Sequence, residues 1–293
     1  MPRTFAAGAS RSAFHAVNSL RFFRRPPVLP GFVPSFGFSV LYLSLVILLP
    51  LSALLLYVSD MTWAEYWQAI TDPRVVQSYK VTVSGAVYST VIVTAIGFVL
   101  AWIVSRYEFP GRRLIDALVD LPFALPTAVA GITLSALFVP TGWLGRWFEP
   151  LGIKISYAYP GLVVAMIFTS LPFIVRSLQP VLEDLEPEFE EAASTLGATR
   201  WQTFWRVLLP SLVPAMIAGS SQAFIRSLGE FGAVIMIAGN IPFQTEITSL
   251  MIFVRLQEFN YPAAAAIASV VLIASLLLLF LLQVVQGRLL RRT

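Results

Sequence analysis

The stretch LEDLEPEFEEAASTLGATRWQTFWRVLLP, from Leu182 to Pro210, is a polar and strongly acidic segment between two long apolar runs. Because apolar runs of this length suit the interior of a bilayer, the segment between them must lie outside it. Pro187 suits the first turn of a helix, and Gly197 suits the position just past a helix end. The sequence therefore predicts a helix of about ten residues between Pro187 and Gly197, about 15 Å long.

One face of this short helix is apolar. It consists of four side chains at the i, i+3, i+4, i+7 spacing: Phe189, Ala192, Ala193 and Leu196. Acidic residues surround this face, and the helix dipole favours negative charge near the N-terminal end, which explains part of the acidity. The dipole does not explain the apolar face, which has no core of its own to cover. We expect a docked partner to cover it.

A second helix start follows directly. Thr199 and Gln202 have the spacing of a capping box, in which each side chain bonds the backbone N–H of the other residue. The following helix carries an apolar stripe and two arginines: Trp201, Phe204, Trp205, Leu208 and Leu209, with Arg200 and Arg206. Aromatic rings beside arginines are typical of a helix at a membrane surface.

The composition excludes several classes of protein. Of 293 residues, 57% are hydrophobic and 12% are charged, whereas charged residues make up about a quarter of an ordinary soluble domain. There is no cysteine, and the single histidine, His15, lies in the N-terminal arm, which argues against thiolate or histidine chemistry. No glycine precedes a lysine, so the chain has no phosphate-binding P-loop, and any ATP is bound by another subunit.

Six uncharged segments are long enough to cross about 30 Å of hydrocarbon, which takes about 20 helical residues. They are Phe36 to Ser59, Val81 to Ser105, Leu121 to Pro140, Ile155 to Val175, Val207 to Ile225 and Asn260 to Gln286. The sequence predicts an all-α polytopic membrane protein, with a transmembrane domain over residues 31–293 and the polar segment at about 182–210.

The orientation follows from Lys and Arg in alternate loops, because cytoplasmic loops are enriched in these residues. One side holds fourteen of them, including Arg176, which we assign to the loop after the fourth span, and the other side holds six. Both termini and the acidic segment are therefore expected in the cytoplasm.

Residues 1–30 hold five arginines and no acid, which favours a basic cytoplasmic arm, although a transit peptide or a twin-arginine signal has a similar composition.

Small residues recur four positions apart in several spans, including Gly85 with Ser89 and Ala215 with Gly219. This spacing lets helices approach closely in lipid. We expect close packing within the subunit, with a dimer face or a moving pore wall as the alternatives.

Four residues are candidates for a solute pathway. Pro122 and Pro126 break the third span near its cytoplasmic end, leaving backbone carbonyls that are tolerated only inside protein or beside a water-filled cavity. A kinked packing helix is an equal alternative. Arg226 and Glu230 lie four residues apart in an apolar environment, where Arg226 could attract an oxyanion and Glu230 could hold its geometry. The alternative is an interfacial ion pair worth a few tenths of a kcal/mol.

Glu191-Ala192-Ala193, Gly197 and Leu209-Pro210, at these spacings, resemble the EAA loop of ATP-binding-cassette importer permeases. The segments DLPFALPTAVAG, RSLGEFGAVIMIAGN and TEITSLMIFVRLQEFNYPAAAAIAS are similar to permeases of the sulfate/thiosulfate type, and the resemblance runs from about Val28 to the C-terminus. Val207, where isoleucine is commonest in that loop, is the one departure.

The resemblance implies a permease working by alternating access, whose EAA helix docks in a groove of a cytoplasmic ATPase. By position, the docking residues are Glu191, Ala192, Ala193 and Gly197. The implied partners are a second, similar permease, two copies of the ATPase that binds ATP and Mg²⁺, a periplasmic binding protein and membrane lipid, with no nucleic acid. This chain itself would be no enzyme and would bind no cofactor, and it would lie in the bacterial inner membrane.

Other functions remain open from the residues alone. The same architecture could carry molybdate or tungstate, since tetrahedral dianions differ little in shape. Two alternatives belong to a different class: a membrane scaffold that recruits a soluble protein, and a membrane-embedded enzyme that uses acidic pairs as general acid and base.

Overall fold

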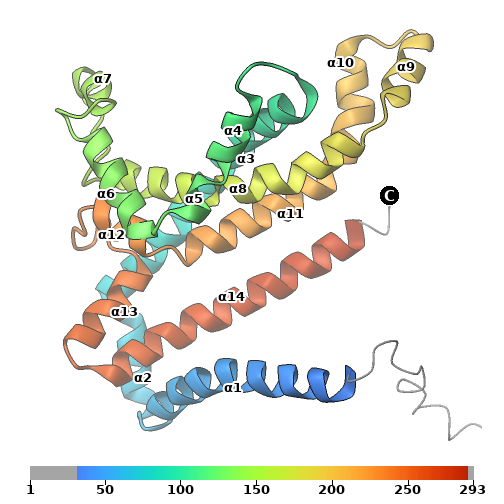
Figure 1. The fold of residues 1–293 in the computed structure, drawn as a ribbon. Coiled ribbons are helices and arrows are strands. Elements are labelled where there is room, and N and C mark those ends of the chain that lie inside the picture. The colour runs from blue at the N-terminus through green and yellow to red at the C-terminus, as the bar shows by residue number, and fades with distance from the viewer. Residues whose placement is uncertain (1–31, 290–293) are drawn as a thin grey trace, which may run out of the picture. The chain divides into compact units, whose positions relative to one another are not determined.

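The computed structural model describes residues 32–289, and every regular element in this range is a helix (Figure 1). The all-α prediction is thus confirmed, while the predicted basic arm, residues 1–30, lies outside the described residues. The chain divides into two units, residues 1–53 and 54–293. The first unit contains, in its described part, most of helix α1 (Phe32–Ser59).

The second unit contains the end of α1 and all the other elements. In chain order these are α2 (Trp63–Thr71), α3 (Pro73–Arg106), α4 (Arg112–Val119), α5 (Leu121–Ala124), α6 (Thr127–Phe138), α7 (Gly145–Phe148), the 3-10 turn η2 (Glu149–Leu151), α8 (Tyr159–Asp184), α9 (Pro187–Thr195), α10 (Arg200–Thr203), the π-helical turn η3 (Phe204–Leu208), α11 (Leu209–Leu228), α12 (Gly232–Ile237), α13 (Thr248–Gln257) and α14 (Tyr261–Leu289).

Five helices in the described range are long and apolar enough to cross a membrane: Pro34–Ser59, Pro73–Arg106, Tyr159–Asp184, Arg200–Leu228 and Tyr261–Val284. They correspond to the first, second, fourth, fifth and sixth predicted spans. The third predicted span, Leu121 to Pro140, is not one helix of that length. Pro126 has extended backbone dihedrals (φ −56°, ψ 130°) and separates α5 from the twelve-residue helix α6, because its ring cannot continue the α5 hydrogen bonds.

The second and fourth predicted spans are longer in the structure than in the sequence prediction. The second begins at Pro73, because the Asp72 side chain accepts hydrogen bonds from the N–H groups of Arg74 and Val75 and so starts the helix. The fourth continues to Asp184, so assigning Arg176 to a loop was wrong: it lies within α8.

The core of the second unit forms where α3, α8 and α11 pack together, and Figure 1 shows α8 and α11 running side by side toward α9 and α10. The small residues make this packing close. A Cβ atom on Gly85 would overlap Leu162 of α8, and one on Gly219 would lie 3.2 Å from the Ile174 backbone. Close packing within the subunit therefore accounts for these two glycines.

Hydroxyl pairs join α3 to α13 and to α11. Thr82 of α3 lies 3.1 Å from Thr248, and Ser89 donates to Ser227 at 3.2 Å. Such pairs satisfy polar groups that lipid cannot hydrate.

Candidate functional site

Helix α9 has the bounds that the sequence predicts, from Pro187 to Thr195, followed by Leu196 as its C-cap. Gly197 has φ +80°, in the left-handed region that glycine adopts without a Cβ clash. The Gly197 N–H donates to the Ser194 carbonyl at 2.9 Å, and the Ala198 N–H donates to the Ala193 carbonyl at 3.0 Å. These two bonds are the Schellman pattern, so Gly197 both ends α9 and turns the chain back.

The apolar face of α9 is uncovered within the described chain. Phe189 is 53% exposed and Leu196 is 87% exposed. Together with Ala192 and Ala193 they line a hollow of about 470 Å³, whose other wall is formed by α10 and η3.

The helix after α9 starts at the predicted capping box. The Gln202 N–H donates to the Thr199 hydroxyl at 3.3 Å, and the Thr199 N–H donates to the Gln202 side-chain oxygen at 2.9 Å. The sequence did not predict the π-helical turn η3 within this continuous helix. Inserted π turns of this kind are frequent at functional sites.

Aromatic rings fix this turn to α3. The Phe204 ring lies 5.7 Å from Trp102 and 6.2 Å from Phe98 between ring centroids, both in edge-on geometry. Trp201 and Trp205 remain 69% and 49% exposed, as expected of residues at a membrane surface.

An ion pair links α9 itself to α3. A guanidinium nitrogen of Arg106 lies 3.0 Å from a carboxylate oxygen of Glu190, and the same guanidinium lies 5.6 Å from the centre of the Trp102 ring. α9 is therefore held to α3 by one side chain and to α8 by the two linking residues, Leu185 and Glu186.

The two short helices α6 and α12 touch through their backbones. A Cβ atom on Gly131 of α6 would overlap the Ala233 carbonyl oxygen, and one on Gly232 would overlap the Thr127 hydroxyl. The structure thus brings Pro126, which precedes α6, close to Glu230, which precedes α12. Pro122 lies in the first turn of α5, on the other side of the break.

Arg226 and Glu230 form the ion pair that their spacing allows, with 2.5 Å between a guanidinium nitrogen and Oε2. Oε2 makes no hydrogen bond within the described chain, whereas Oε1 accepts one from the Ala233 N–H at 3.0 Å. The Glu230 side chain is 1% exposed and that of Arg226 is 31% exposed. Glu230 joins the end of α11 to the start of α12.

Two further arginines form ion pairs that the sequence analysis did not predict. Arg74 donates to Glu246 through Nε at 2.8 Å and Nη2 at 2.5 Å, and the Glu246 side chain is 4% exposed. Arg176 pairs with Asp116 and Asp120. These partners are distant in sequence, so spacing gives no signal for them.

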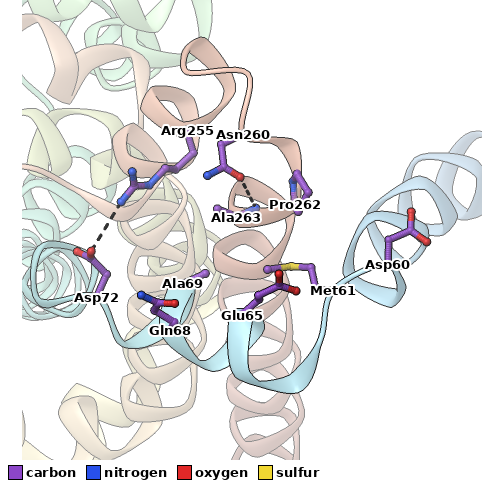
Figure 2. A pocket seen from close by; sticks show the side chains of 10 residues that line it. All are labelled: Asp60, Met61, Glu65, Gln68, Ala69, Asp72, Arg255, Asn260, Pro262 and Ala263. Atoms are coloured by element: carbon purple, nitrogen blue, oxygen red, sulfur yellow. Dashed lines mark hydrogen bonds and ion pairs between the residues drawn. The ribbon is translucent and has the colours of Figure 1, made fainter.

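A polar hollow of about 500 Å³ lies where α2 meets α13 and α14 (Figure 2). Asp60, Glu65 and Asp72 line it opposite Arg255, which approaches Asp72 to 3.9 Å and Glu258 to 2.9 Å. Hydrogen bonds from the Thr62 N–H and then from its hydroxyl lower the pKa of Glu65, so this carboxyl stays ionised at neutral pH. With three carboxylates and one guanidinium, the hollow repels a dianion.

Among the described residues, no group of three His, Asp or Glu side chains could hold a metal ion. The candidate functional features are the uncovered apolar face of α9 and the ion pairs near the breaks between helices.

Residues 93–293 match the family described as "Binding-protein-dependent transport system inner membrane component". The chain belongs to this family. It is therefore a membrane permease subunit and not itself an enzyme.

Members of this family with similar sequences are sulfate permeases. The chain is 60% identical over 265 residues to the "Sulfate transport system permease protein CysT" of Escherichia coli (strain K12), covering 90% of this chain and 96% of that protein. It is 46% identical over 248 residues to the protein of the same name from Synechocystis sp. (strain ATCC 27184 / PCC 6803 / Kazusa), covering 85% and 87%.

Solved structures of importers share the fold. A bacterial ABC transporter involved in the import of the acidic polysaccharide alginate superposes with a TM-score of 0.73 at 17% identity, covering 87% of this chain and 95% of that one. Inward-facing conformations of the MetNI methionine ABC transporter give a TM-score of 0.57 at 16% identity, covering 78% and 99%. At these identities the likeness concerns the fold.

Proposed function

We propose that the chain is the membrane permease of an ATP-driven importer of sulfate and thiosulfate. The observation that carries this is the 60% identity, over nearly the whole length of both chains, to a sulfate transport permease. Such an importer works by alternating access, with the ATP hydrolysed by a separate subunit. Its place is the inner membrane of a bacterium, with both termini and α9 in the cytoplasm.

In this proposal α9 is the coupling helix. Phe189 and Leu196 provide exposed apolar surface that can bind in a groove on the ATPase. Ala192 and Ala193 have small side chains, so the same face of the helix can enter the groove. Glu191 adds a charge at the rim, where electrostatics favour a defined register. The Schellman turn at Gly197 sets the angle between α9 and the helix that enters the membrane.

The proposed solute pathway passes the breaks in the helices. Pro122 and Pro126 have no N–H to donate, and neither α5 nor α6 has a side-chain hydrogen bond at its N-terminal end, an arrangement that is tolerable beside a water-filled path. Arg226 is paired with Glu230, which precedes α12, and its side chain is partly exposed, so it can attract a dianion while Glu230 holds its guanidinium in place.

The proposed assembly contains a second permease of the same family, two ATP-binding-cassette subunits that bind ATP and Mg²⁺, and a periplasmic sulfate-binding protein. One solved structure with the same fold is a bacterial alginate ABC transporter in complex with an alginate pentasaccharide-bound periplasmic protein. The uncovered face of α9 is consistent with a soluble subunit docked on the cytoplasmic side.

Uptake of radiolabelled sulfate by the importer in proteoliposomes tests the proposal. With binding protein outside and ATP inside, we expect uptake that requires ATP and is inhibited by excess unlabelled thiosulfate. Stronger inhibition by molybdate or tungstate than by thiosulfate would assign a different oxyanion. Absence of any ATP-dependent flux from an assembled complex would favour a scaffold and contradict the proposal.

A further inference from the structure

Arg176, in the predicted cytoplasmic half of α8, uses all five of its N–H groups. Nε and Nη2 donate to the two carboxylate oxygens of Asp120 at 2.9 and 2.6 Å. Nη1 donates to the Asp116 carboxylate at 2.7 Å and to the Gln179 side chain at 2.5 Å, and Nη2 also donates to the Asp116 backbone carbonyl at 3.0 Å. A guanidinium has five N–H donors, so none remains for substrate.

The two aspartates lie at the start of the broken third span. Asp116 belongs to α4, and Asp120 is both the C-cap of α4 and the N-cap of α5. One side chain of α8 therefore fixes the junction between two short helices. From that junction the chain runs through α5 and the break at Pro126 into α6, which touches the backbone of α12.

Apart from these hydrogen bonds, little buried apolar surface holds the junction between α4 and α5 in place. Val119 is the only buried residue of α4, and α5 has none. One edge-on contact between the Phe123 and Phe173 rings, 5.3 Å apart, adds to it. The bidentate guanidinium contacts, which have a fixed planar geometry, are thus the main directional connection from α8 to α4 and α5.

The C-terminal end of α8, where Arg176 lies, leads to α9. Arg176 lies about two turns before Asp184, where α8 ends. Gln179 continues the polar contacts in that direction by donating to Glu183 at 3.1 Å. Only two residues, Leu185 and Glu186, link the end of α8 to the start of α9.

We propose that Arg176 is a positioning residue that makes α8, α4 and α5 move as one body, so that movement of α9 reaches the broken third span. This rests on the proposed coupling role of α9. Arg176 acts through Asp116 and Asp120 and does not contact the transported anion.

The first test compares uptake with ATP hydrolysis in the reconstituted importer. R176Q removes the positive charge and the planar, bidentate guanidinium. We therefore expect the number of sulfate ions imported per ATP hydrolysed to fall about tenfold, while the KM for the loaded binding protein stays unchanged. R176K keeps the charge without the planar fork and is expected to be intermediate. R255Q, which removes an ion-paired arginine elsewhere, is the control and should keep the wild-type ratio.

A residue with only a structural role would lower uptake and ATP hydrolysis together, leaving their ratio unchanged. That result, or a wild-type ratio in R176Q, would overturn the proposal. D120N is expected to resemble R176Q, and the double variant R176Q/D120N should be no worse than R176Q, because both changes remove the same contact.

The second test measures the movement directly. The chain contains no cysteine, so spin labels introduced at Ala117→Cys and Asp184→Cys are the only ones attached to this subunit. In the assembled importer we expect the distance distribution between the labels to be the same with and without ATP, and R176Q to broaden it. An ATP-dependent shift of the wild-type distribution would overturn the proposal. If the wild-type importer moves another anion, sulfate specificity fails while this test still applies.

Discussion

A guanidinium nitrogen of Arg106, in the last turn of α3, lies 3.0 Å from a carboxylate oxygen of Glu190, in the first turn of α9. The proposed coupling helix is thus attached to a span that is distant from it in sequence. The Trp102 ring beside the same guanidinium also contacts Phe204 of the π-helical turn. The C-terminal end of α3 therefore contacts both α9 and the helix that follows it, the two parts of the polar segment from Leu182 to Pro210.

Removing this attachment should have a small effect. The side chain of Glu190 is 43% exposed, and exposed ion pairs contribute about 0.2–1 kcal/mol. For Glu190→Gln we expect sulfate uptake to fall by less than about fivefold, with no further loss when Arg106→Gln is added. Glu188→Gln, in the same turn, is the control. An equal loss in this control would show that overall charge, and not the pair, matters.

Gly197 should tolerate only residues that adopt a positive φ. No atom lies within 4 Å of a Cβ built at this position, so the constraint is the backbone and not space. A valine would cost about 1–2 kcal/mol in the left-handed region and would favour a different turn, whereas asparagine enters this region readily. We predict that Gly197→Val lowers uptake per ATP about tenfold and that Gly197→Asn stays close to wild type. Equal uptake by the two variants would contradict this role.

The contact between α6 and α12 should be sensitive to a single methyl group. In Gly131→Ala the new Cβ would overlap the Ala233 carbonyl oxygen, and overpacking of this kind costs about 1–3 kcal/mol. We expect a lower melting temperature for the purified protein in detergent. Gly229→Ala, where the nearest atom would lie at 3.8 Å, is the matched control and should melt like the wild type. A stable Gly131→Ala variant would show that the two helices separate easily.

The Arg226–Glu230 pair should respond unequally to loss of either partner. Arg226→Met leaves a carboxylate that is 1% exposed without its cation, and unpairing a buried charge costs about 3–5 kcal/mol at most. Glu230→Gln keeps an oxygen that can accept from the Ala233 N–H and leaves a partly exposed arginine that water can reach. The melting temperature should therefore fall further in Arg226→Met. A larger fall in Glu230→Gln would mean that Arg226 is the less hydrated partner.

Local signals in the sequence predict local structure well. Pro187 and Gly197 give the bounds of α9, and the capping box at Thr199 and Gln202 is present as predicted. These features depend on residues within one or two turns of each other, so the spacing alone determines them. The five long helices follow from the length of the apolar runs.

Contacts between distant residues could not be predicted in the same way. Arg176 with Asp120 and Arg74 with Glu246 join elements whose proximity depends on the packing of α3, α8 and α13. Hydropathy also assigned the third span as one helix, because α5 and α6 are both apolar and the effect of Pro126 on the backbone does not change hydropathy. The π-helical turn at Phe204 has no sequence signal that we recognise.

Coupling through α9 is tested most directly by the number of sulfate ions imported per ATP hydrolysed when Ala192 is replaced by tryptophan. The Ala192 side chain lies on the uncovered face, so the added ring should not disturb the helix itself but should overfill a partner's groove. The account predicts a ratio about tenfold below wild type, with normal membrane insertion and continued ATP hydrolysis. A wild-type ratio in Ala192→Trp would contradict it.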